Sequence, residues 1–217
     1  VVERIVEVEK TVEVTKEVTP TLEPEAPAAH RTLVVCISEE PDTLYTYGGS
    51  GTSATHIQQA VYDGPIDNRN YAYQPVILEK LPSLNDGDAV VNAVTVQAGD
   101  IVVDDAGDPL ELDAGAIVRP AGCRSPDCAV EFTGEPIEMD QMVATFEMLE
   151  GLVWSNGDPL TADDSVYGFE LNADPDTPTS HHVVDRTASY EATSDTVAAW
   201  TGLPGYVDEL YYTNFWH

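Results

Sequence analysis

The segment 152–164 limits the possible folds of this chain most, because it specifies three local structures in a set order. An apolar run is followed by an Asn-Gly pair at positions 156 and 157, the dipeptide typical of a tight turn. Thr161 then stands three residues before Asp164, which is close to a capping box with Asp in the place of Glu. The sequence therefore predicts a strand, a tight turn and a capped helix.

Alternating side chains predict an amphipathic strand over residues 141–154. Met142, Ala144, Phe146 and Met148 fall on one side of an extended chain, and their neighbours fall on the other. Trp154 ends this strand, so we expect its side chain to lie in the core.

Other elements follow from composition and from turn residues. Residues 32–38 read as a buried strand, with Cys36 as a buried, inert thiol. Pro175 and Pro178 end the helix that begins after Thr161. We also expect a helix over 53–62, a loop over 62–67, strands within 90–103 and 128–133, and a hairpin over 188–201.

The charge balance argues against one large class of partner. The chain has 217 residues, of which 39 are acidic and 9 are basic, for a net charge of −30. Nucleic acid is therefore not expected as a partner, because a phosphate-binding face needs basic residues. The acidity is consistent with solubility or with a salty medium, and also with attraction of cationic solutes. No apolar stretch reaches the 18 residues of a membrane span.

The first 31 residues differ in character from the rest. Val, Glu, Lys and Thr recur with a period of six, and a proline-rich stretch follows from Thr19 to Ala29. An even period suits an extended chain, and the prolines favour an open polyproline-like state. We therefore interpret residues 1–31 as a stalk and residues 32–217 as the folded part.

No catalytic set is evident, so we expect no enzymatic activity and neither a cofactor nor a metal. Asp104, Asp105 and Asp108 surround a glycine, but they lack the ligand spacing of a calcium loop and suit a solvated turn. His181 and His182 are adjacent and have no acidic partners in sequence, which makes a metal site the weaker reading.

The segment 152–164 resembles a signature of the extracellular solute-binding proteins of ABC importers, in the large peptide- and nickel-binding group. The family pattern is Trp-Ser-Asp-Gly-x-Pro-Leu-Thr-Ala-x-Asp, and Asn156 here stands in the place of the first Asp. The stretch Glu40-Pro41-Asp42-Thr43-Leu44 resembles a second family element, Glu-Pro-x-x-Leu. The stalk resembles the tails that follow the lipidated cysteine of bacterial surface lipoproteins.

The resemblance implies an α/β fold of the type II periplasmic-binding-protein kind. Two lobes of such a protein close on a ligand and present it to a permease. At 217 residues, the chain would hold mostly the first lobe, with the second largely missing. The implied function is capture of an external solute, with a peptide expected first and a nickel chelate or an oligosaccharide left open. Its implied place is the outer side of the cytoplasmic membrane or the periplasm, on a lipid anchor upstream of Val1.

Three side-chain roles depend on this reading. Tyr45 and Tyr47 follow the first predicted strand, on a loop that would lie over the cleft, and they either contact ligand or only cover the loop. In an exported protein, Cys123 and Cys128 are expected to form a disulfide, with a zinc site as the alternative. A secreted enzyme domain and a stalked adhesive or structural module remain as other functions. The latter predicts strands without a cleft and without a capped helix at Thr161.

Overall fold

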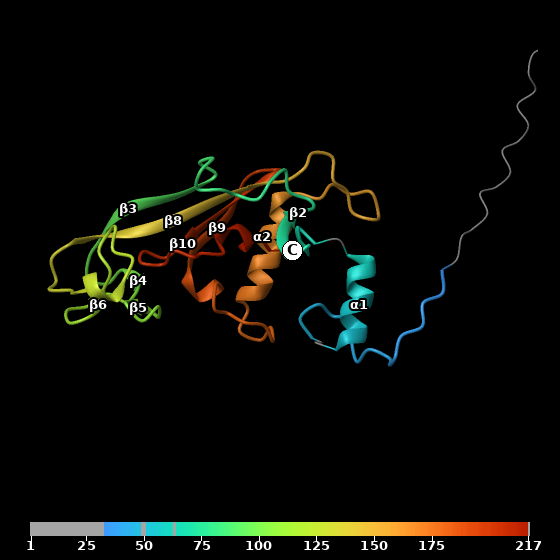
Figure 1. The fold of residues 1–217 in the computed structure, drawn as a ribbon, viewed down its shortest axis with the longest axis horizontal. Coiled ribbons are helices and arrows are strands. Elements are labelled where there is room, and N and C mark those ends of the chain that lie inside the picture. The colour runs from blue at the N-terminus through green and yellow to red at the C-terminus, as the bar shows by residue number, and fades with distance from the viewer. Residues whose placement is uncertain (1–32, 49–50, 63, 217) are drawn as a thin grey trace, which may run out of the picture. The chain divides into compact units, whose positions relative to one another are not determined.

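The computed structural model describes residues 33–48, 51–62 and 64–216 (Figure 1). The predicted stalk, residues 1–31, lies outside this part of the chain. The chain divides into two units, residues 1–37 and residues 38–217. The second unit contains all of the helices and strands described below, so the architecture is mixed α/β.

The largest sheet has four antiparallel strands. Their order is β3 (Ala89–Val96), β8 (Ile137–Glu147), β10 (Val197–Gly202) and β9 (Thr187–Ser194). The predicted alternation is confirmed, because Met142, Ala144 and Phe146 are fully buried on one face of β8. The predicted hairpin is also confirmed, since β9 and β10 pair across the turn at Asp195.

Helix α2 (Ala162–Ala173) packs against β9 and β10, as Figure 1 shows. Phe169 of this helix meets the ring of Tyr190 at 5.4 Å between centroids and that of Trp216 at 4.8 Å. Tyr190 is buried, and this burial raises the pKa of its hydroxyl. The chain near residue 216 therefore belongs to the same core as the sheet and the helix.

Two smaller sheets enclose a second core. Strand β4 (Ile101–Val103) pairs with β5 (Pro109–Glu111), and β6 (Ile117–Val118) pairs with β7 (Val130–Glu131). Five buried apolar residues from these strands, their flanking residues and the end of β3 pack with Met139 of β8: Val96, Val102, Leu112, Val118 and Phe132. Gly205 lies against this second core. Its backbone N–H donates to the Asp140 carbonyl at 2.8 Å, and a Cβ there would overlap the Val103 carbonyl.

The remaining elements are short. Helix α1 (Thr52–Val61) confirms the helix expected over 53–62. Strands β1 (Ile66–Arg69) and β2 (Ala72–Pro75) form a hairpin through Asn70 and Tyr71, which both have positive φ. Three turns of 3₁₀ helix complete the described chain, at Pro126–Cys128, Val184–Arg186 and Tyr211–Thr213. None of the described helices is long and apolar enough to cross a membrane.

Several sequence-based expectations were wrong. Residues 33–38 are not a strand, and Leu33 is 86% exposed, because the described chain supplies no neighbouring strand to pair with them. Cys36 is exposed for the same reason. Strand β8 ends at Glu147, so Trp154 lies beyond it and is 44% exposed. Ile66 and Asp67, which were expected in the loop over 62–67, belong instead to β1, because they pair with Pro75 and Gln74 of β2.

Candidate functional site

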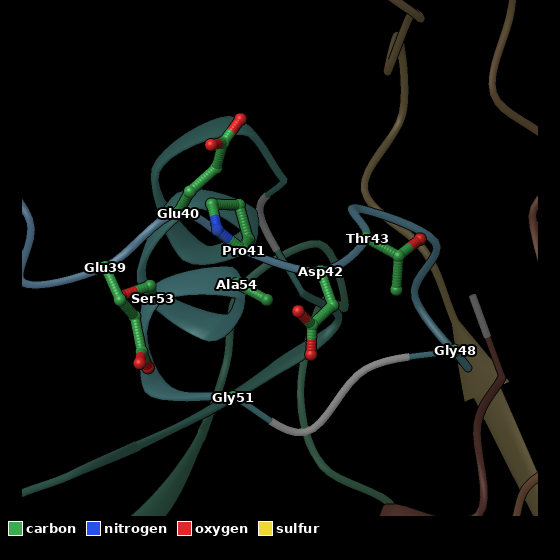
Figure 2. A pocket seen from close by; sticks show the side chains of 9 residues that line it. All are labelled: Glu39, Glu40, Pro41, Asp42, Thr43, Gly48, Gly51, Ser53 and Ala54. Carbon is green, nitrogen blue, oxygen red and sulfur yellow. The ribbon is translucent and has the colours of Figure 1, made fainter.

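A cavity of about 380 Å³ lies beside the loop that follows residues 33–38. Its walls come from this loop and from the start of α1, and its lining residues are Glu39, Glu40, Pro41, Asp42, Thr43, Gly48, Gly51, Ser53 and Ala54. Figure 2 shows the carboxylates of Glu39 and Asp42 directed toward the side where Gly51 lies, whereas the Glu40 carboxylate points the other way. Two of the three lining acids therefore face the same space.

The first turn of α1 forms the floor of this acidic cavity. Ser53 and Ala54 line the cavity and are each 2% exposed. Gly51 caps the helix without a side-chain hydrogen bond. None of the lining residues is basic. An opening lined by carboxylates and hydroxyls suits a solute that carries N–H donors or a positive charge.

Tyr45 and Tyr47, the predicted ligand contacts, lie next to this cavity but do not line it. Their rings meet edge to face at 5.7 Å between centroids. The Tyr45 ring packs over Gly48, a lining residue, where a Cβ would come within 2.8 Å of the Tyr45 Cδ1. Tyr45 is half exposed. These contacts fit the covering role that the sequence left open, and a direct ligand contact stays a prediction.

Tyr47 has a second role that the sequence does not reveal. Its hydroxyl accepts a hydrogen bond of 2.8 Å from Asn172 Nδ2, near the end of α2. Partial burial raises the pKa of the Tyr47 hydroxyl, an effect that the bond from Asn172 partly offsets. The loop beside the cavity is therefore attached to α2. No sequence signal pairs these residues, because they lie far apart in the chain.

The start of α2 has the geometry that the segment 152–164 predicts. Asp164 Oδ2 accepts hydrogen bonds from the Thr161 backbone N–H at 2.7 Å and from the Thr161 hydroxyl at 3.2 Å. The preceding turn is closed by the Gly157 N–H, which donates to the Trp154 carbonyl at 2.8 Å. Asn156 and Asp158 bond each other within this turn. The segment thus positions α2, and α2 in turn holds Tyr47.

We expect Asp164→Ala to lower the free energy of unfolding by about 1 kcal/mol, because it removes the acceptor of the capping bonds. Urea titration followed by circular dichroism measures the change. Asp163→Ala is the matched control, since Asp163 is an exposed acid in the same helical turn and makes no capping bond. Equal losses in the two variants would mean that helix-dipole charge, and not the cap, provides the stability.

The structure also places the other candidate residues. Cys123 and Cys128 form a disulfide with an S–S distance of 2.05 Å. Among the described residues there is no group of three or more possible metal ligands, and this holds for His181 and His182. The acidic turn at 104–108 has a structural partner instead. Arg186 Nε donates to the Gly107 carbonyl at 2.7 Å, and Arg186 Nη2 pairs with Asp108 Oδ1 at 3.2 Å.

Comparison with known proteins gives little support for any assignment. No family model matches the chain, and no curated protein matches it. One solved structure that matches is an oligopeptide-binding protein from Thermus thermophilus in complex with a pentapeptide, with 12% sequence identity and a TM-score of 0.44. The match covers 74% of this chain and 22% of that protein, so the chain spans less than a quarter of its length. A TM-score below 0.5 is too low to establish a shared fold.

Proposed function

We propose that this chain is part of the substrate-binding subunit of an ABC importer, which captures an external solute for transport across the membrane. The observation that carries the proposal is the hydrogen bond between Tyr47 and Asn172. It joins the loop after Glu40-Pro41 to the helix that the segment 152–164 begins. The two sequence elements that resemble the solute-binding family are therefore linked in space, beside a cavity of about 380 Å³.

The chemistry of that acidic cavity supports a peptide as the solute. Glu39 and Asp42 present carboxylates to one side, and the lining contains no cation to neutralise them. A peptide supplies an ammonium group and a series of amide N–H donors, and hydrogen bonds to a charged acceptor are the stronger kind. A loop held by a packed helix is also the usual place for binding groups.

A stalked adhesive or structural module is the second function that the sequence allows. That reading predicts strands without a cleft and without a capped helix at Thr161. The capped helix α2 and the cavity beside α1 both favour the transport reading.

The proposal includes a location and partners. The protein would lie on the outer side of the cytoplasmic membrane or in the periplasm, attached through a lipid anchor upstream of the stalk. The type II two-lobed fold would close on the solute and deliver it to the permease subunits. This subunit would catalyse no reaction, because ATP is hydrolysed by another component of such importers.

The test is calorimetric titration of the protein, in its longest natural form, with short peptides, a nickel chelate and an oligosaccharide. We expect peptides to bind and Asp42→Asn to weaken their affinity about tenfold, which corresponds to one charge-assisted hydrogen bond. Asp176→Asn is the matched control, since Asp176 is an exposed acid outside the cavity.

Two results would contradict this proposal. One is peptide affinity that Asp42→Asn leaves unchanged, which would place the binding elsewhere. The other is the absence of binding for all three solute classes, which would favour the structural module.

A further inference from the structure

A second cavity, of about 260 Å³, lies in another part of the molecule and shares no lining residue with the acidic cavity beside α1. Its walls are the loop from Arg119 to Arg124, Asp140 of β8 and the segment from Gly205 to Glu209. Basic residues are concentrated around this cavity, which is unusual in so acidic a chain. Residues 32–217 contain only five cations, and two of them, Arg119 and Arg124, line this one cavity.

Two opposite charges of the second cavity, those of Arg124 and Asp140, neutralise each other. Arg124 Nη1 donates to Asp140 Oδ2, and the Gly122 backbone N–H donates to the same oxygen at 2.8 Å. The disulfide between Cys123 and Cys128 closes the loop that carries Arg124. These contacts hold the loop in one conformation before any ligand arrives, which lowers the entropy cost of binding.

Two opposite charges of this cavity have no ionic partner among the described residues. Arg119 Nη2 donates to the Asp105 carbonyl at 2.5 Å, and Arg119 Nε is buried without a hydrogen-bond acceptor. Arg119 forms no ion pair within the described part of the chain, and neither does Glu209, which is exposed. The two side chains line the same cavity, yet they do not pair with each other. The cavity therefore presents a cation and an anion that are not paired with each other.

We propose that the second cavity binds a small zwitterion of the amino-acid class. The ligand carboxylate pairs with Arg119, whose planar guanidinium suits carboxylates, and the ligand ammonium pairs with Glu209. Val207 and Cys123, which also line the cavity, supply apolar groups for a short side chain. The volume is below the usual range for drug-sized ligands, which also indicates a small molecule.

The net charge of the protein favours a zwitterion over a simple ion. A plain anion is repelled by the field of a chain with a charge of −30. A plain cation would lie beside the positive charge of Arg119, which repels it. A zwitterion has no net charge, so the long-range field does not oppose its approach, and both local charges gain a partner.

The test is titration of the protein with L-alanine, followed by NMR chemical shifts, with acetate and methylammonium as half-ligands. We expect L-alanine to bind at least about tenfold more tightly than either half-ligand, because two charge pairs form at once. Arg119→Gln and Glu209→Gln should each weaken L-alanine about tenfold. Asp127→Asn is the control, because Asp127 is an exposed acid of the disulfide loop that does not line the cavity.

Because Glu209 is exposed, Glu209→Gln changes the cavity without disturbing the packed core. The test therefore does not depend on correct folding of the Arg119→Gln variant. Acetate that binds as tightly as L-alanine, together with an unchanged affinity in Glu209→Gln, would overturn the zwitterion assignment. Absence of L-alanine binding would also overturn it. Asp42→Asn, which changes the acidic cavity, is expected to leave the affinity for L-alanine unchanged. Failure of the zwitterion proposal can therefore be distinguished from failure of the proposed peptide binding.

Discussion

The Trp200→Ala variant is expected to unfold with a free energy about 4 kcal/mol below that of the parent chain, because it leaves a large cavity in the core. Trp200 lies in β10, has no solvent-exposed surface, and its indole N–H donates to the Thr187 hydroxyl at 2.8 Å. Its ring also meets that of Tyr206 at 6.1 Å between centroids. Burial and a neighbouring Asp208 raise the pKa of Tyr206 to about 12, which fits the packed environment of this ring.

Urea unfolding followed by far-UV circular dichroism measures this loss. The chain supplies a matched control, since Trp154 is the same residue type but is 44% exposed. Trp154→Ala should change the free energy of unfolding by less than about 1 kcal/mol. Similar losses in the two variants would show that Trp154 is buried after all, and that the strand predicted to end there extends beyond Glu147.

The Arg186→Met variant is expected to lose about 2–3 kcal/mol of unfolding free energy, because three hydrogen bonds of one buried guanidinium disappear. Arg186 Nη1 donates to the His182 carbonyl at 2.8 Å, and the other two bonds reach Gly107 and Asp108. The side chain of Arg186 is 10% exposed, whereas that of Asp108 is 76% exposed. Methionine retains much of the apolar stem, so the variant removes mainly the bonds.

Substitution of Asp108, the ionic partner of Arg186, measures how much of that loss in unfolding free energy comes from the ion pair. Because Asp108 is exposed, its ion pair with Arg186 is screened, and Asp108→Asn should cost less than about 1 kcal/mol. The same urea titration measures both variants. If Asp108→Asn cost as much as Arg186→Met, the ion pair and not the bond to the Gly107 carbonyl would hold the acidic turn in place.

Local patterns in the chain predicted several elements correctly. The alternation in β8 sorts side chains between two faces of a strand, and the capping residues of α2 act within one turn of helix. The hairpin of β9 and β10 needs only a short turn. Each of these signals depends on neighbours in sequence, so it can be recognised without knowledge of the tertiary structure.

The sites were less predictable than the elements. The sequence pointed to Tyr45 and Tyr47 as ligand contacts, whereas Glu39 and Asp42, and not these two tyrosines, line the acidic cavity. Residues 33–37 show a related error, since their composition favours a strand although no described strand pairs with them. The chemistry of a residue can be read from its type, but its partners are set by contacts between distant segments.

The amino-acid sequence was sufficient to predict much of the strand at 137–147, the turn at Asn156-Gly157 and the capped helix from Ala162, together with a charge that disfavours nucleic acid. The folded arrangement was needed to establish that Trp154 is exposed, that Asn172 holds Tyr47, and that Arg119 and Glu209 face one cavity. The difference comes from the range of the interactions. Periodicity, turns and caps act over a few residues, whereas burial and charge pairing depend on which distant segments the packed core brings together.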